Sequence, residues 1–431
     1  MSTKHMTLHL RSEQKPLEHC SVLTPSTIKA LILAGYEVLV ERSPKDPSRK
    51  RIYYDEEFEQ VGAKLVDDQS WSKAPRDRII IGLGELAPES FPLLHTHVQF
   101  AHCYKGQAGW QDILSRFTRG GGTLLDLEFL QLVDGRRAAV FGYYSGFVGA
   151  ALAIKAWKWQ LDHPGEQLPG VESFTQGRGY YLNEDEMLEQ LRIELRLGIE
   201  KAGRDPIVLV MNSLGRHGSG AVDLLLRAGL SSSQILKWDI VETLKRGPFL
   251  EIVESDIFVN CVSLSDPIAP FLTAVTLASP SRKLSVICDV ACDPINPHNL
   301  IPVYKGNTTF TNPTIPVDVE NEPPLSIISI NHLSSLLPRE SSEELSNALL
   351  PYLLELKDWK NNDAWSRAEM LFREKAAMVQ TDQAGVPGRN ISQRMDPPRL
   401  IDMSWIHHSF KDEFRRWDEN KWNVSYHIQD A

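Results

Sequence analysis

A glycine-rich stretch that follows a short apolar run carries the residue types that bind phosphate. Residues 207–211 read Ile-Val-Leu-Val-Met, which predicts a buried parallel strand. Residues 212–220 follow with three glycines, and residues 221–229 read as a helix that ends at a glycine. Glycines let the backbone turn tightly and approach a pyrophosphate, which free N–H groups at the start of the helix can hold. The spacing therefore predicts a dinucleotide-binding turn.

A carboxylate at Asp239 completes this unit and indicates which dinucleotide binds. Asp239 ends a second predicted strand, residues 235–239, and lies 24 positions after Gly215. A carboxylate there accepts hydrogen bonds from the adenosine ribose and repels a 2′-phosphate, which favours NAD over NADP. The pattern is G-x-x-G-x-G with Asn212 where a first glycine is expected, and Asn tolerates a positive φ. The alternative left open is an ordinary βα turn that binds no dinucleotide.

A second set of candidate residues could move protons and bind carboxylates. Residues 98–105 are predicted to form a strand that ends in His102 and Lys105, and active-site groups of α/β sheets lie past the carboxyl ends of strands. A histidine titrates near neutral pH, and Arg136 and Arg137 follow on a turn, where an arginine can grip a carboxylate. The alternatives are a core histidine, a solvated lysine and a surface pair of arginines.

Strands alternate with helices along the chain, which predicts an α/β fold with parallel sheets. Because strands occur both before and after residues 207–239, we predict two Rossmann-like lobes. The expected strands are residues 6–11, 36–41, 78–84, 98–105, 257–262, 284–290 and 325–330. A helix within residues 141–161 is expected to connect the lobes, and a helix from residue 334 onward is expected to return to the first lobe. The predicted boundaries are 1–142 plus about 338–380 for the substrate-side lobe, 143–337 for the NAD-binding lobe and 381–431 for a C-terminal extension of unknown role.

Composition excludes several classes of protein. The 431-residue chain has a formal net charge of −10, which argues against a nucleic-acid surface. No apolar run is long enough to span a membrane, and the N-terminal residues lack a signal-peptide core. The five cysteines show no paired zinc spacing, so no metal site is expected and the thiols fit a reducing compartment. We predict a cytoplasmic monomer that acts on a small molecule.

Several blocks of the chain together resemble fungal saccharopine dehydrogenase, the NAD-dependent, lysine-forming type. The similarity spans roughly residues 5 to 380. The blocks are residues 101–110, 126–130, 214–220, 236–240, 296–299 and 332–340. The resemblance implies a two-lobed enzyme of the alanine dehydrogenase-like class with NAD in a cleft between the lobes. It also implies hydride transfer that interconverts saccharopine with lysine and 2-oxoglutarate.

The resemblance assigns roles residue by residue. His102 would be an acid–base group. The residues that would face an amino-acid or oxo-acid substrate are Gln107, Arg137, Phe141, Ala291, Cys292 and Asp293. The residues that would bind the cofactor are Arg136, Gly215, Arg216, Asp239, Thr243, Ser263, Val290, Ile330, Asn331, His332 and Leu333.

The chain departs from this family at positions that matter for chemistry. Gly84 stands where the family has a catalytic lysine, and Cys20 stands where it has a substrate-binding arginine. His217 replaces one of two family cysteines, so Cys261 lacks the partner for a disulfide, and Asn331 replaces an aspartate. Loss of a positioned acid–base group alone costs about two to four powers of ten in rate.

These departures leave three hypotheses. The first is an NAD-dependent oxidoreductase that acts on a different secondary amine or imine of opine-like type, in secondary metabolism. The second is a true saccharopine dehydrogenase of lysine biosynthesis, with His102 and Lys105 or His19 taking over the lost roles, although His19 is predicted to lie in an exposed loop. The third is a non-catalytic NAD-binding protein. The tryptophan-containing residues 381–431 are expected to pack on the body or on a partner.

Overall fold

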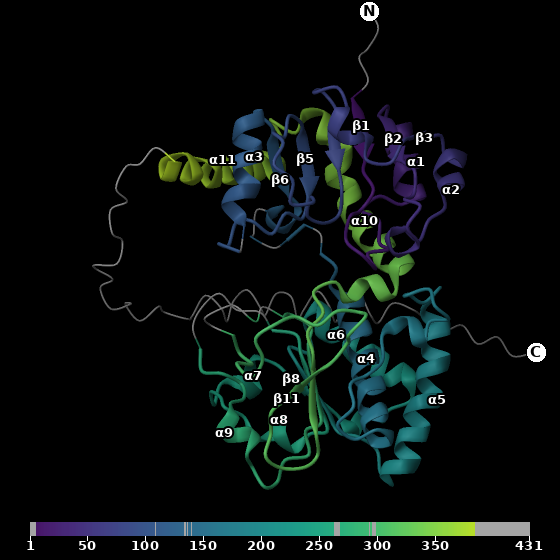
Figure 1. Ribbon diagram of the computed structural model, residues 1–431, viewed down its shortest axis with the longest axis vertical. Coiled ribbons are helices and arrows are strands. Elements are labelled where there is room, and N and C mark those ends of the chain that lie inside the picture. The colour runs from purple at the N-terminus through teal and green to yellow at the C-terminus, as the bar shows by residue number, and fades with distance from the viewer. Residues whose placement is uncertain are drawn as a thin grey trace, which may run out of the picture. The chain divides into compact units, whose positions relative to one another are not determined.

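Two six-stranded sheets organise the chain in the computed structural model, which describes residues 6–107, 109–132, 135, 137–138, 140–262, 268–292, 294 and 299–383 (Figure 1). The first sheet contains β1 (Thr7–Leu10), β2 (Glu37–Glu41), β3 (Lys64–Val66), β4 (Ile79–Ile81), β5 (Thr96–Gln99) and β6 (Thr123–Asp126). The second contains β7 (Val208–Met211), β8 (Ile235–Trp238), β9 (Ile257–Asn260), β10 (Val286–Asp289), β11 (Ile315–Val317) and β12 (Leu325–Ile328).

Helices surround both sheets. The helices that precede β7 are α1 (Pro25–Leu33), α2 (Asp55–Gln60), α3 (Trp110–Gly120), α4 (Tyr143–Asp162) and α5 (Glu184–Ala202). Those that follow it are α6 (Arg216–Ala228), α7 (Ile240–Thr243), α8 (Leu250–Glu254), α9 (Ala274–Leu277), α10 (Pro338–Leu354) and α11 (Asp363–Gln383). No helix in the described part of the chain is both long enough and apolar enough to cross a membrane.

The first sheet is parallel throughout and has the order β3-β2-β1-β4-β5-β6. Leu10 pairs with Ile81 and Ile81 with Val98, so the carboxyl ends of β1, β4 and β5 lie side by side. β6 extends the same edge, because Gln99 pairs with Asp126. Loops that are far apart in the sequence therefore start from neighbouring points on one edge.

Each face of the first sheet is covered because its strands are apolar on both sides. Leu8 and Leu10 point to the face covered by α1 and α10, where Leu345 and Leu349 pack. The alternate residues Ile80 and Leu124 point to the opposite face, where they pack with α3 and the end of α11. Phe372 of α11 meets Phe117 of α3 edge to face, with ring centroids 5.7 Å apart.

The second sheet has the order β11-β12-β10-β9-β7-β8, and β11 alone runs antiparallel to its neighbour. Val208 and Val210 face the layer of α4, α5 and α6, whereas Leu209 and Met211 face the layer of α8 and α9 (Figure 1). β7 has β8 on one side and β9 on the other, so the loop that follows it leaves the sheet at the point where the strand order reverses.

The predicted α/β class with two parallel-sheet lobes is confirmed, whereas the predicted strands 78–84 and 98–105 are too long. The first of these is β4, Ile79–Ile81. The expected strand 98–105 is β5, Thr96–Gln99, and residues 101–105 form a loop. His102 has a φ of +47°, which an extended strand does not allow. The proposed domain boundaries stay a prediction, and the expected packing of residues 381–431 concerns a segment that lies almost wholly outside the described residues.

Candidate functional site

The turn after β7 brings the backbone close to the start of α6. Asn212 adopts a φ of +59°, so it makes the turn that a first glycine makes in the common pattern. A Cβ atom on Gly218 would overlap the backbone carbonyl of Asn212, so only glycine fits there. Gly215 is the N-cap residue of α6, and no side chain caps that helix start. Its N–H groups therefore suit a phosphate.

Glycines also hold α6 against α4. A Cβ atom on Gly220 would overlap the carbonyl of Tyr143, and a Cβ atom on Gly146 would overlap the carbonyl of His217. The two helices therefore meet through their backbones. This contact fixes the direction in which the start of α6 points, which a phosphate site requires.

Asp239 lies directly beside the glycine-rich turn. Its Oδ2 atom accepts the Leu214 N–H at 2.9 Å, and its Oδ1 atom accepts the Ile240 N–H at 3.2 Å. The Thr243 hydroxyl donates to the backbone carbonyl of Asp239 at 3.2 Å. A half-buried carboxylate next to a bare helix start fits the ribose and pyrophosphate of NAD, as the sequence predicts.

The other predicted cofactor residues divide into two kinds. Val290, Ile330 and Leu333 have side chains in the hydrophobic core of the second sheet, so only their backbone atoms are available to a ligand. Asn331 is exposed, and its Oδ1 atom accepts a hydrogen bond from the Lys15 ammonium group at 2.8 Å. Two more of the predicted cofactor residues have accessible side chains: Arg216 is exposed and His332 is half-buried. Arg136 and Ser263 lie outside the described residues.

His102 lies at the carboxyl edge of the first sheet in an ion pair with Glu85. Its Nδ1 atom is 2.6 Å from a Glu85 carboxylate oxygen, and both side chains are about half exposed. Burial by itself would lower the pKa of His102, but the Glu85 carboxylate outweighs burial and raises it above the ordinary histidine value. The loops after β4 and β5 thus bring together an acid and a base that can exchange protons with a ligand.

Two further carboxylates follow β6 and face the same region. Burial raises the pKa of Asp126 to about 7, although Asp126 accepts the Glu128 N–H at 2.9 Å. The nearly buried Glu128 carboxylate is 2.6 Å from the Lys105 ammonium group and 3.4 Å from the Arg137 guanidinium. A mixed set of titratable groups therefore surrounds the loop that carries His102.

The structure groups some of the predicted substrate residues with His102. Gln107 accepts the Lys105 N–H at 2.8 Å through its side-chain oxygen. Phe141 lies 6.4 Å from Phe100, whose ring is stacked 6.5 Å from that of His102. The remaining predicted residues follow β10 in the second sheet, where Ala291 and Cys292 are half-buried and Asp293 lies outside the described residues.

The segment around Cys20 holds a buried thiol and a buried carboxyl group. Burial, followed by the nearby Glu18 carboxyl, raises the pKa of the Cys20 thiol well above its ordinary value. Burial likewise raises the pKa of Glu18 to about 7, and its Oε1 atom accepts the Cys20 N–H at 3.1 Å. A neutral thiol cannot grip a substrate carboxylate as an arginine does.

The expectation of an exposed His19 is wrong. Its side chain is fully buried, and its Nδ1 atom lies 2.6 Å from the carbonyl oxygen of Lys50. Its backbone N–H donates to Ser335 at 2.7 Å. Contact with a segment more than 300 positions away buries this polar stretch, which its local sequence does not reveal.

Three polar residues near the His102 loop were not predicted from the sequence as site residues. Glu85 pairs with His102, while Arg11 and Glu13 contact the turn that precedes Glu85. All three follow strands β1 or β4, which neighbour each other in the sheet. Polar residues directly past the carboxyl ends of adjacent parallel strands are the signal that could have found them.

The chain contains two α/β lobes. One carries a dinucleotide-type turn and the other carries acid–base groups, which is the arrangement of an oxidoreductase of the alanine dehydrogenase class. Residues 9–148 match the alanine dehydrogenase/PNT N-terminal domain, and residues 241–383 match the C-terminal domain. A solved L-alanine dehydrogenase shares the fold with a TM-score of 0.56 at 15% identity, over 88% of this chain and 99% of that one. A transhydrogenase from Sinorhizobium meliloti gives a TM-score of 0.52 at 13% identity, over 81% of this chain and 94% of that one.

Curated relatives narrow the class to one family. The NAD(+)-dependent, L-lysine-forming saccharopine dehydrogenase of Neurospora crassa is 54% identical over 86% of this chain and 97% of its own length. The enzyme of the same name from Schizosaccharomyces pombe is 50% identical over 85% of this chain and 97% of its own length. The chain belongs to the saccharopine dehydrogenase family.

Family membership confirms the predicted class, an oxidoreductase that uses NAD and acts on CH–NH groups. A small-molecule amino-acid substrate agrees with the names of the relatives. Those names favour the second hypothesis, lysine biosynthesis, over the first, a changed substrate. The roles of individual site residues and the cytoplasmic monomer stay predictions.

Proposed function

We propose that this protein is an NAD-dependent saccharopine dehydrogenase, which interconverts saccharopine with lysine and 2-oxoglutarate. The observation that carries the proposal is 54% identity to a relative of that name over 97% of the relative's length. The two sheet edges support it, because one presents a phosphate-binding turn and the other a histidine paired with a carboxylate.

The chemistry requires a hydride acceptor and several proton transfers. The start of α6 and Asp239 would hold NAD, which would supply the hydride acceptor for oxidation of the secondary amine to an imine. His102 is proposed to exchange protons with the amine, the incoming water and the leaving amine. The Glu85 carboxylate outweighs burial and raises the pKa of His102, which makes the protonated ring more available as an acid.

A second candidate function is an opine-like substrate other than saccharopine. The specific observation behind it is the neutral, buried Cys20 together with Gly84, which has no side chain, at the positions where the resemblance expects an arginine and a lysine. A substrate with a different arrangement of carboxylates would need neither. This candidate keeps the cofactor turn and the role of His102 unchanged.

A screen of NADH oxidation separates these functions. Lysine with 2-oxoglutarate is compared with a panel of other amino acids and oxo acids, and saccharopine with NAD is tested in reverse. We expect turnover of saccharopine that falls about a hundredfold or more in His102→Gln, with NADH binding retained. Turnover of another pair alone would establish the second candidate, and NADH binding without any turnover would favour the non-catalytic hypothesis.

A gain-of-function pair sharpens the choice. Gly84→Lys combined with Cys20→Arg should increase saccharopine turnover if the loss of those groups limits the rate. A double variant that folds and binds NADH but gains nothing on saccharopine would contradict that explanation.

A further inference from the structure

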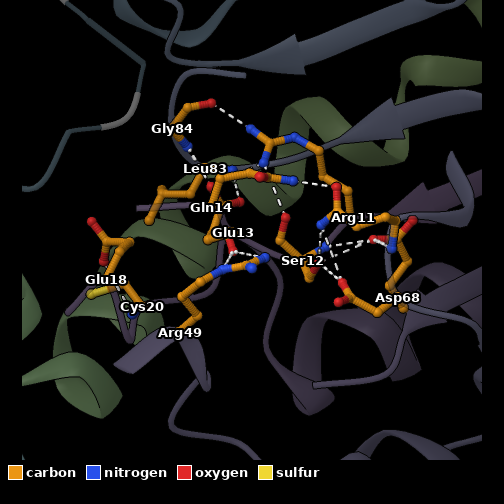
Figure 2. A network of polar contacts seen from close by, with 12 residues as sticks. Arg11, Ser12, Glu13, Gln14, Glu18, Cys20, Arg49, Asp68, Leu83 and Gly84 are labelled. Atoms are coloured by element: carbon orange, nitrogen blue, oxygen red, sulfur yellow. Dashed lines mark hydrogen bonds and ion pairs between the residues drawn. The ribbon is translucent and has the colours of Figure 1, made fainter. Parts of the chain in front are cut away.

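The turn that follows β4 is held by two side chains from the loop that follows β1. The Glu13 carboxylate accepts the Leu83 N–H at 2.6 Å through Oε1 and the Gly84 N–H at 3.0 Å through Oε2. Figure 2 shows that both Glu13 and Arg11 reach this turn, whereas Glu18 and Cys20 lie apart from them. One carboxylate therefore binds two successive backbone donors, which defines the path of the turn.

Arg11 completes the contact from the other end of the turn. Its guanidinium is fully buried, donates to the Gly84 carbonyl and forms an ion pair with Glu13 at 3.1 Å. It also lies directly against Gly82, where a Cβ atom would overlap it. The absence of a side chain at Gly82 is thus what admits the guanidinium.

The held turn leads directly to Glu85, the partner of His102. Glu85 is the next residue after Gly84, and its carboxylate lies 2.6 Å from the His102 ring. The other charged groups that act on His102 are Asp126 and Glu128, both at the end of β6. Glu128 is itself paired with Lys105 and Arg137, so Glu85 is the carboxylate in direct contact with the histidine.

We propose that Arg11 and Glu13 are positioning residues, which hold the turn at Leu83 and Gly84 and thereby place Glu85 against His102. The assignment rests on the proposed function only for the catalytic role of His102. The geometric part stands on the contacts alone. A buried ion pair is expensive to desolvate and is a poor general stabiliser, so its hydrogen bonds to the turn at Leu83 and Gly84 point to a role in geometry.

The test measures the pKa of His102 by NMR in the full chain without cofactor or substrate. Glu85→Gln removes the direct partner of His102 and should lower the pKa of His102 more than any other variant in the series. Glu13→Ala and Glu13→Gln should give intermediate shifts in the same direction, because the released turn lets Glu85 move away. Gly82→Ala should do the same without altering any charge, because it displaces the Arg11 guanidinium.

A matched control distinguishes positioning from a general loss of stability. Asp256 makes similar contacts just before β7 in the second sheet, where it accepts the Ile207 N–H at 2.8 Å and pairs with Arg204 at 2.6 Å. Asp256→Ala should destabilise the protein by a similar amount and leave the His102 pKa unchanged. If Glu13→Ala does not fold, Glu13→Gln and Gly82→Ala still provide the measurement.

The proposal is overturned if folded Glu13→Gln and Gly82→Ala both keep the parent pKa of His102 while Glu85→Gln lowers it. It is also overturned if Asp256→Ala shifts that pKa as much as they do. Activity does not enter this measurement, so failure to turn over saccharopine would sink the proposed function and leave the positioning result intact.

Discussion

The carboxyl edges of the two sheets differ in which groups form the candidate site. At the edge of the second sheet, backbone groups and missing side chains make the site, because Gly218 and Gly220 would each meet a carbonyl if they carried a Cβ atom. At the edge of the first sheet, side chains make the site, with Glu85, His102 and Glu128 in ion pairs. A phosphate needs close N–H donors, whereas proton transfer needs titratable groups, so each edge matches the task proposed for it.

The strands of the two sheets also differ in how many buried titratable side chains they carry. Buried histidines lie on strands of the first sheet, where His9 pairs with Glu41 at 3.1 Å and His97 packs edge-on to Trp71 and Phe117. The strands of the second sheet, Val208–Met211 to Leu325–Ile328, contain no histidine. The strands of the first sheet therefore carry buried histidines, through which its stability should respond to acid.

The largest effect is expected from filling the backbone contact at the second edge. Gly218→Ala should weaken NADH binding more than tenfold and lower the free energy of unfolding by about 1–3 kcal/mol, since the new methyl group overlaps the Asn212 carbonyl. Fluorescence titration with NADH and urea unfolding measure the two effects. Gly306→Ala is the control, because a Cβ atom there meets nothing within 4 Å. Equal behaviour of the two variants would show that the close approach is unimportant.

Asp239→Ser should have a smaller effect that is confined to the cofactor. Loss of the carboxylate removes a charged acceptor for the ribose, worth about 1.5–3 kcal/mol, and removes its repulsion of a 2′-phosphate. NAD affinity should fall about tenfold or more while NADP affinity falls less or rises. Competition titrations with both cofactors measure the ratio. An unchanged ratio would place the ribose elsewhere.

Acid should destabilise the first sheet through the buried His97. Burial holds the pKa of His97 well below its ordinary value, so the unfolded chain binds the proton more readily than the folded chain does. That contribution to stability is complete above pH 6.5 and is lost as the pH falls through 6.5 towards the folded pKa. His97→Phe should remove on the order of 1 kcal/mol of this loss at pH 5.5.

Urea unfolding at pH 8 and pH 5.5, with amide exchange assigned to each sheet, measures this response. An unchanged pH dependence in His97→Phe would show that another group governs acid sensitivity.

The smallest effect is expected at the exposed end of the first edge. The Lys105 ammonium group is half exposed, so its pair with Glu128 is screened by water and salt. Lys105→Met should change the free energy of unfolding by less than about 1 kcal/mol, with the difference shrinking at high salt. Thermal unfolding at low and high ionic strength measures it. A loss of several kcal/mol would mean that Glu128 depends on this lysine alone.

The local sequence pattern predicts a structural feature correctly where residues close in the sequence determine that feature. Apolar runs bounded by glycine and proline predict strands in both sheets, and the predicted strand 207–211 differs from β7 by one residue. Asn212 was recognised as a residue that can turn with a positive φ, and its φ is +59°. Asp239 was expected beside the turn, and it binds the Leu214 N–H there.

Local pattern failed where distant segments decide. His102 was expected at a strand end, but the paired strand stops at Gln99 and the histidine lies in a loop with positive φ. His19 reads as a polar loop residue, yet Ser335 and its neighbours bury it. Arg11 and Glu13 attracted no notice, because their partners lie about 70 positions further along the chain.

By itself the sequence determined the α/β class, the NAD-type turn and the family, because these depend on residue types at short and regular spacing. Only the tertiary structure decided which polar groups share a sheet edge. Parallel strands bring the loops after β1, β4, β5 and β6 together regardless of their separation in sequence. The ion pairs of His102 and Glu13, and the pKa shifts of His102 and Asp126, follow from that arrangement, since electrostatic interactions depend on distance in space.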